Sequence, residues 1–344
     1  MTVHLHDLAE ITAQVLADPE ESVRTEPSVG ADHPFFGVRQ GNLSSEFCKG
    51  NLFLLQQIEQ AGIIIMHKDV SFPTEKLKGK KLFLLDMDGT LYLDGQLFAG
   101  TMPFLRAVSD RGGRCLYLTN NSSKSVDAYV EKLAGMGISA TARDFVTSVD
   151  ATAAYIKEHY GEKTVFLLGT ESFRRQMAAA GITGTTDRDD PDIAALVMGF
   201  DTELTFSKLL DASYLLTVRK DIGYVAANPD LVCPTSFGYV PDCGSVAVML
   251  KNATGRMPVF IGKPEPEMVR MALKKTNTSP SDAVLIGDRV YTDIACGLNA
   301  GIDTVMVLSG EGTVKEAQER GITPTWIMRD IGEVADVIAP SENQ

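Results

Sequence analysis

The stretch Lys81-Leu-Phe-Leu-Leu-Asp-Met-Asp-Gly-Thr90 carries the strongest fold signal of the chain. Residues 82–85 form a short apolar run, which is typical of a buried strand in a parallel sheet. The run ends at Asp86 and Asp88, and the Asp-Gly pair that follows indicates a sharp turn. Because ligands of open α/β sheets bind at the carboxyl ends of the strands, we expect a site at this turn.

Two carboxylates at one strand end indicate phosphate chemistry that depends on a metal ion. Neighbouring acids repel each other, and a divalent cation with a preference for oxygen ligands, such as Mg²⁺, would offset the repulsion. One acid could then attack phosphorus while the other donates and accepts a proton. Alone, an apolar run with an Asp-Gly pair is more often only a turn. Three further segments shift the balance towards a site.

The first of these segments suits a phosphate group. Thr119, Asn120 and Asn121 follow the apolar run 115–118 and precede a helical pattern at 125–136. A hydroxyl, side-chain amides and free backbone N–H groups at a helix start can bind a phosphate. The same residue types are also ordinary helix caps, so this segment is ambiguous by itself.

The other two segments supply a cation and two more acids. Lys263 follows an apolar strand pattern and precedes Pro264, which would suit the first turn of a helix. A lysine there could neutralise both a phosphate and a carboxylate, although a single lysine is usually a surface residue. The strand 284–286 leads to Asp288, with Asp293 about one helical turn further on. An acid at this point would complete a metal site.

Together, the segments 86–90, 118–121, 262–264 and 287–293 resemble the four ordered motifs of the haloacid dehalogenase superfamily. The resemblance is closest to the NagD-type (class IIA) phosphatases, and it runs from about residue 80 to about residue 338. It also rests on Asn228-Pro-Asp230, the turn 241–245 and Leu308-Ser-Gly310. One departure lies in the turn, which has Asp242 where relatives often have glycine.

The resemblance implies a role for each matching residue. Asp86 would attack phosphorus and become an aspartyl-phosphate, and Asp88 would act as general acid and then as general base. The phosphate would be held by Thr119, Asn120, Asn121 and Lys263. Mg²⁺ would be bound by the Asp86 carboxylate, the Asp88 main-chain carbonyl and Asp288, with Asp293 just outside the direct ligands.

The predicted fold is α/β, with a Rossmann-like core around a parallel sheet, an inserted α/β cap domain and an N-terminal extension. We predict a mostly helical extension at 1–79, core segments at 80–155 and 258–344, and the cap at 156–257. The stretch before residue 259 is too long for a simple crossover and contains strand and helix patterns of its own. Closure of such a cap would exclude water and contribute contacts to the leaving group.

Several polar residues of the predicted cap are candidates for substrate contacts. They are Asn228, Asp230 and Asp242, with Tyr239 and Ser245 beside them. For each of them, an ordinary polar residue in a turn is an equally good interpretation.

Composition excludes several classes of protein. The chain has 344 residues, of which 44% are hydrophobic and 22% charged, and a net charge of −13. Without a long basic run, nucleic acid and anionic membranes are not expected partners. No apolar segment approaches the roughly 20 residues of a membrane span, and no signal sequence is evident, so we expect a cytoplasmic protein. The five cysteines are odd in number and scattered, which indicates reduced thiols.

The sequence therefore predicts a Mg²⁺-dependent phosphatase that acts on small phosphomonoesters of the nucleotide or sugar phosphate class. The alternatives are a phosphomutase of the same superfamily and a catalytically idle module that binds a phosphate or a partner. A small phosphorylated metabolite is the expected partner, and the resemblance leaves a homodimer open.

Overall fold

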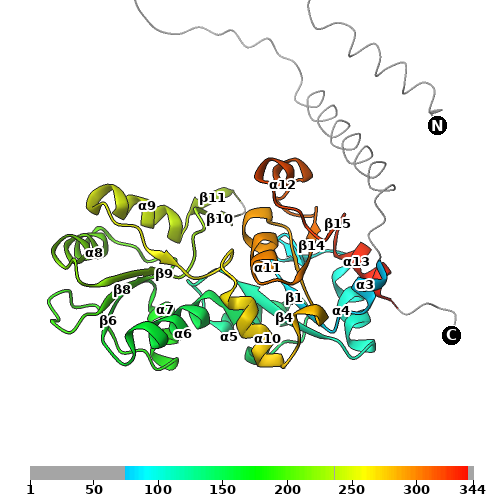
Figure 1. Cartoon of the computed structure of the whole chain (residues 1–344), viewed down its shortest axis with the longest axis horizontal. Coiled ribbons are helices and arrows are strands. Elements are labelled where there is room, and N and C mark those ends of the chain that lie inside the picture. The colour runs from blue at the N-terminus through cyan, green and yellow to red at the C-terminus, as the bar shows by residue number, and fades with distance from the viewer. Residues whose placement is uncertain (1–73, 236, 340–344) are drawn as a thin grey trace, which may run out of the picture. The chain divides into compact units, whose positions relative to one another are not determined.

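The computed structural model describes residues 74–235 and 237–339 (Figure 1). The predicted N-terminal extension therefore lies outside the described residues except at its end, where helix α3 spans Thr74–Lys78. Within the described part of the chain, no helix combines the length and the apolar character that a membrane span requires. The four cysteines of this part are free thiols, as predicted.

The larger of the two main sheets has six strands, in the order β15-β14-β13-β1-β4-β5, and all of them run parallel. Their bounds are β1 Leu82–Leu85, β4 Arg114–Thr119, β5 Phe145–Thr147, β13 Ala283–Gly287, β14 Asp303–Val307 and β15 Trp326–Met328. Strand β1 lies between β4 and β13, and every residue of β1 is buried. The predicted parallel sheet around residues 82–85 is confirmed.

Helices and a small hairpin surround this sheet. They are α4 Thr101–Asp110, α5 Val126–Gly135, α11 Ala295–Asn299, α12 Val314–Arg320 and α13 Ile331–Ile338, with the hairpin strands β2 Tyr92–Leu93 and β3 Gln96–Leu97. Helix α4 packs against α13. Three single-turn helical segments complete this part, η1 Ala142–Asp144, η2 Pro280–Asp282 and η3 Val290–Ile294.

The smaller sheet has five parallel strands, in the order β12-β9-β8-β6-β7. Their bounds are β6 Val165–Leu168, β7 Gly184–Thr185, β8 Ala195–Met198, β9 Gly223–Ala226 and β12 Val259–Phe260. The helices α7 Glu171–Ala179, α8 Phe206–Val218 and α9 Cys243–Thr254 accompany it, together with the hairpin β10 Val232–Thr235 and β11 Gly238–Pro241. We call this part, from β6 to β12, the cap.

The edges of the cap differ from the predicted ones. The predicted boundary at 258 implied that Val259–Phe260 belong to the larger sheet. Strand β12 instead pairs with β9, so these two residues belong to the cap sheet. The predicted boundary at 155 falls inside helix α6, which spans Ser148–Tyr160. An apolar run indicates a strand but does not determine which sheet it joins, because both sheets bury the same residue types.

Helices α6 and α10, which spans Glu267–Thr276, contact each other and lie between the two sheets (Figure 1). One hydrophobic cluster includes Leu84 and Leu118 from the larger sheet, Leu167 from the cap sheet, Ile156 from α6 and Val269 from α10. The two sheets are therefore joined by a shared apolar core, which fixes how their strand ends face each other.

Replacing Ile156 with alanine should lower the free energy of unfolding by about 2–5 kcal/mol, because this fully buried side chain links both sheets. Urea denaturation followed by circular dichroism would measure the loss. Leu210→Ala is the matched control, since Leu210 is 52% exposed on α8 and its loss should change stability by less than about 0.5 kcal/mol. Equal effects of the two substitutions would contradict the shared core.

Candidate active site

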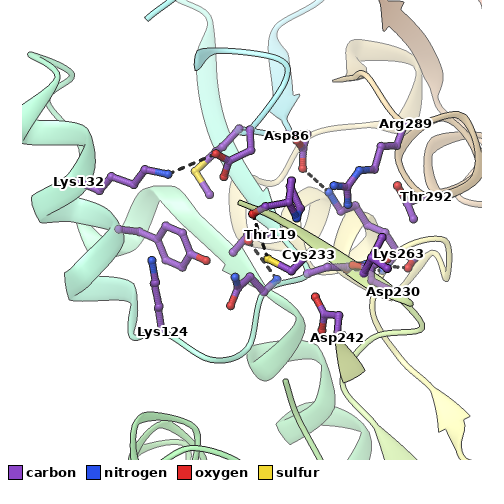
Figure 2. A pocket seen from close by; sticks show the side chains of 17 residues that line it. Asp86, Thr119, Lys124, Lys132, Asp230, Cys233, Asp242, Lys263, Arg289 and Thr292 are labelled. Atoms are coloured by element: carbon purple, nitrogen blue, oxygen red, sulfur yellow. Dashed lines mark hydrogen bonds and ion pairs between the residues drawn. The ribbon is translucent and has the colours of Figure 1, made fainter. Parts of the chain in front are cut away.

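The carboxyl ends of three adjacent strands bring distant residues to one edge of the larger sheet. Asp86 follows β1, Thr119 ends β4, and Asp288 follows β13. Lys263 does not come from the larger sheet but from the segment that follows β12 of the cap sheet. Figure 2 shows Asp86, Thr119 and Lys263 around one pocket, with a cavity of about 170 Å³.

Lys263 forms ion pairs with two of the acids, Asp86 and Asp293. Its ammonium Nζ lies 2.6 Å from Asp86 Oδ1 and 2.6 Å from Asp293 Oδ1, and its side chain is only 4% exposed. Burial alone would lower the pKa of Lys263, but the Asp293 and Asp86 carboxylates outweigh it and raise the pKa. Lys263 is therefore a fixed cation in the pocket.

The predicted helix start at Pro264 is wrong. Helix α10 begins at Glu267, after a cis peptide bond between Lys263 and Pro264. Proline is common at helix starts and in turns alike, so its position after Lys263 did not distinguish the two.

Three carboxylates form a cluster that fits a metal ion. Ligand atoms of Asp86, Asp288 and Asp293 all lie within 4.8 Å of one another. Burial, and next the Asp293 carboxylate, raise the pKa of Asp86 to about 8 although Lys263 opposes the shift. The same two causes raise the pKa of Asp288 to about 7. The fold thus crowds acids that are costly to ionise without a further cation.

The surroundings of Asp288 support the same interpretation. Its Oδ2 accepts a hydrogen bond of 2.8 Å from the Glu311 N–H, whereas its buried Oδ1 has no partner in the described part of the chain. A Cβ atom on Gly310 would lie 1.9 Å from Asp288 Oδ2, so only glycine allows this close approach. A buried carboxylate oxygen without a donor matches what an oxygen-preferring divalent cation requires.

Asp293 differs from the other two acids because both of its oxygens are already bonded to protein. Oδ1 accepts from Lys263 Nζ at 2.6 Å, and Oδ2 accepts from the Arg289 N–H at 3.1 Å. Asp293 is thus held as a partner of Lys263.

The Asn120 side chain connects the larger sheet with the cap and with Lys263. Its Nδ2 donates to Asp230 Oδ2 and to the Lys263 carbonyl, both at 3.0 Å, and its Oδ1 accepts from the Lys263 N–H at 2.8 Å. Both amide hydrogens are therefore bonded to protein and are not directed at the cavity. The neighbouring Asn121 is also bonded locally, since its Oδ1 accepts from the Ser123 N–H and hydroxyl.

The structure separates the predicted cap residues into two groups. Asp230 and Asp242 line the cavity, whereas Asn228 is fully buried and does not. The Asn228 side chain donates to the Asn120 carbonyl at 2.8 Å and accepts from the Asp230 N–H at 3.0 Å, so it fixes the loop. Tyr239 and Ser245 do not line the cavity either, and the Ser245 hydroxyl donates to the Leu231 carbonyl.

The two cap acids are buried at the wall of the cavity. Asp242 is the N-cap of α9 and accepts from the Cys243 N–H. Burial raises its pKa to about 7, the Cys243 N–H opposes this, and the nearby Asp230 adds to it. The Oδ1 of Asp230 is buried and has no partner among the described residues. The cap thus presents acceptor oxygens with unused hydrogen-bonding capacity.

Sequence reasoning missed several basic and aromatic side chains of the pocket. They are Lys124, Tyr129, Lys132 and Arg289. Arg289 could have been anticipated from the sequence, because it directly follows Asp288 in the segment 287–293. In the structure its Nη2 lies 3.0 Å from Glu311 Oε1. Tyr129 and Lys132 are three residues apart on α5, a spacing that places them on one helix face.

Comparison with known proteins assigns the family. The chain matches two family models, described as haloacid dehalogenase-like hydrolase over residues 83–183 and as HAD-hydrolase-like over residues 260–334. It is 35% identical over 255 residues to an acid sugar phosphatase of Staphylococcus haemolyticus, which covers 74% of this chain and 95% of that protein. The chain belongs to the haloacid dehalogenase superfamily.

Solved structures of the superfamily show the same fold. A 4-nitrophenylphosphatase from Thermotoga maritima has 37% identity and a TM-score of 0.71, and the match covers 76% of this chain and 99% of that one. NagD from Escherichia coli K-12 has 28% identity and a TM-score of 0.66 over 74% of this chain and 98% of that one. The predicted NagD-type resemblance and the predicted phosphatase class are confirmed.

Binding of a divalent cation at the three carboxylates, with Mg²⁺ as the probe, should be stronger at about pH 9 than at about pH 6, because the cation needs carboxylates that the metal-free fold keeps protonated. The pKa values of about 8 for Asp86 and about 7 for Asp288 lie above the ordinary carboxyl range. Their contribution to the stability of the metal-free protein is thus present at low pH and is lost as the pH rises through these values.

The increase in melting temperature on adding Mg²⁺, measured at about pH 6 and at about pH 9, tests this expectation. The increase should be larger at the higher pH, and Asp288→Asn should abolish most of it. An increase that is the same at both pH values in the wild-type protein would contradict the arrangement.

Proposed function

We propose that the protein is a Mg²⁺-dependent phosphatase that hydrolyses small phosphomonoesters through an aspartyl-phosphate on Asp86. The observation that carries the proposal is the buried Lys263 ammonium, 2.6 Å from Asp86 Oδ1, beside a cluster of three carboxylates. Sugar phosphates are the favoured substrates within the nucleotide and sugar phosphate classes, since a curated relative is an acid sugar phosphatase.

The first step is attack of an Asp86 carboxylate oxygen on phosphorus. Two anions at contact repel by a few kcal/mol for each charge pair, taking an effective dielectric constant of about 20. Lys263 lowers this barrier because its ammonium is already fixed beside Asp86 and needs no rearrangement. A bound Mg²⁺, held by Asp86, Asp288 and the Asp88 main-chain carbonyl, would supply further positive charge for the phosphate and the nucleophile.

Asp88 is placed to exchange protons at the pocket. It lines the same cavity as Asp86, and its side chain is 49% exposed, so it can face the leaving group and then water. In the first step its carboxyl proton passes to the leaving oxygen as the P–O bond breaks. In the second step it accepts a proton from the water that attacks the aspartyl-phosphate, which releases inorganic phosphate and restores Asp86.

Binding of the phosphoryl oxygens falls to Thr119, Lys263 and the main chain of residues 119–121. Thr119 lines the cavity at the end of β4, and its hydroxyl accepts a hydrogen bond from the Asn121 N–H at 3.2 Å. Asn120 contributes indirectly, because its side chain holds the main chain of Lys263 through two hydrogen bonds. Asn121 lines the cavity and supports the turn through its bonds to Ser123.

The leaving group would contact the cap acids. Asp230 and Asp242 offer carboxylate oxygens at the cavity wall, and Asp230 Oδ1 lacks a donor among the described residues. The hydroxyl groups of a sugar can donate to such acceptors, which a purely apolar leaving group cannot do. Buried acceptors that are left unpaired cost free energy, so this wall favours a leaving group rich in hydroxyls.

Asp86→Asn should reduce phosphate release by about a thousandfold or more, because the amide cannot form the aspartyl-phosphate. Release of inorganic phosphate from p-nitrophenyl phosphate and a panel of sugar phosphates and nucleotides would be measured with Mg²⁺. Removal of Mg²⁺ by a chelator should abolish the activity, and its return should restore it. Asp110→Asn, at an exposed position on α4, is the control and should retain wild-type activity.

Two results of this experiment would refute the proposal. Wild-type protein that releases no phosphate from any ester would favour a binding module. An isomeric ester formed in place of free phosphate would instead indicate a mutase.

Asp242→Ser should lower kcat/KM for a sugar phosphate by about 3- to 10-fold, the range typical of one lost hydrogen bond. Serine keeps the N-cap of α9 but is too short to reach into the cavity, so the fold should be preserved. The value for p-nitrophenyl phosphate should change by less than about twofold. Ser245→Ala, outside the cavity, should leave the ratio of the two values unchanged. A ratio that Asp242→Ser also leaves unchanged would exclude this contact.

A further inference from the structure

Lys132 lies against the acid that the proposed function uses for proton transfer. Its Nζ is 3.4 Å from Asp88 Oδ1 and donates to the Tyr92 hydroxyl at 3.0 Å. The Tyr92 hydroxyl in turn donates to Asp88 Oδ2 at 3.2 Å. Lys132 comes from the last turn of α5, forty residues further along the chain than Tyr92.

Tyr92 is a rigid support in this arrangement. It is fully buried, and its carbonyl accepts from the Gly89 N–H at 2.8 Å, which ties it to the Asp88 turn. The Lys132 Nζ also lies 4.1 Å from the centre of the Tyr92 ring, a favourable position for a cation. Lys132 is thus held by the ring and the hydroxyl of a side chain that has little room to move.

The direction of each hydrogen bond is determined by chemistry. An ammonium group can only donate, so the Tyr92 hydroxyl accepts from Lys132 and has its own hydrogen free for Asp88. Both oxygens of Asp88 therefore face a donor, and the second lone pair of each oxygen is left for the reaction. Both donors thus face the oxygens on which negative charge appears when Asp88 gives up its proton.

We propose that Lys132, supported by Tyr92, is a positioning residue that stabilises the charge appearing on Asp88 when it protonates the leaving oxygen. The inference rests on the proposed function. As Asp86 attacks phosphorus and the P–O bond breaks, the Asp88 O–H bond also breaks and its proton joins the leaving oxygen. Asp88 thereby changes from neutral to anionic beside a fixed cation. Lys132 thus acts on the transition state more than on the bound substrate.

This role makes the effect of Lys132 depend on the leaving group. An alkoxide, such as that of a sugar, must be protonated as it departs. p-Nitrophenolate is a stable anion that leaves with little help from an acid. A lysine that acts through Asp88 therefore matters for the first kind of ester and hardly for the second. A lysine that only attracts the substrate or supports the fold would affect both equally.

The test compares kcat/KM for a sugar phosphate and for p-nitrophenyl phosphate, since this constant reports the steps up to transfer of the phosphoryl group. Lys132→Met should lower the sugar phosphate value by about 10- to 100-fold, as expected for loss of a bond to a charged group, and the p-nitrophenyl value by less than about threefold. Lys132→Arg should restore the sugar phosphate value to within about threefold of wild type. Asp88→Asn should show the same discrimination between esters, and the double variant should lose little more than Asp88→Asn alone.

A matched control comes from the same pocket. Lys124→Met removes an identical charge from the cavity wall, at a residue with no contact to Asp88 among the described hydrogen bonds and ion pairs (Figure 2). It should change both esters by the same factor. Melting temperatures of all variants, with and without Mg²⁺, would show that the fold and the metal site are intact.

Two outcomes would overturn the inference. In the first, Lys132→Met lowers kcat/KM by the same factor for both esters, or lowers the sugar phosphate value further than Asp88→Asn does. In the second, Lys132→Arg fails to restore the sugar phosphate reaction while its melting temperature is unchanged. A wild-type protein that cleaves neither ester would instead refute the proposed function, and this inference with it.

Discussion

The placement of the Lys263 ammonium between Asp86 and Asp293 is the interaction on which the rest of the site depends. Once all three clustered carboxylates are ionised, the Lys263 ammonium offsets only one of their charges, and a divalent cation would offset the other two. Buried ion pairs rarely add net stability, because desolvation costs as much as attraction returns. We infer that this cluster is retained for chemistry, and that the surrounding fold offsets its cost.

That offset comes from the way in which the two sheets are joined. Lys263 follows a strand of the cap sheet, whereas Asp86 follows a strand of the larger sheet, so a slip between the sheets would separate the pair. The hydrophobic cluster through Ile156 opposes such a slip by packing both sheets against shared helices. Asn120 adds a polar connection at the same junction, since its side chain binds both Asp230 and the Lys263 main chain. Apolar packing thus places the sheets, and hydrogen bonds align the reactive groups.

The sequence predicted well what depends on local pattern. The strand 82–85, the acids after it and the meeting of three strand ends follow from apolar runs and parallel topology. It failed where the outcome depends on pairing at a distance. Val259–Phe260 joined the cap sheet and Pro264 did not start a helix, because neither choice is encoded in nearby residues. Lys132 escaped notice for the same reason, since its contact with Asp88 exists only once α5 has packed.

Under the proposed function, the two sheets contribute different parts of the substrate site. Groups of the larger sheet and Lys263 would surround the phosphoryl group, which every phosphomonoester contains. The cap adds Asp230 and Asp242 at the cavity wall, where they would contact the group attached to the phosphate. Because burial makes these acids costly to leave without a donor, they would favour leaving groups that carry hydroxyls. Substrate choice can therefore change through a few cap residues while the charge cluster around Lys263 stays the same.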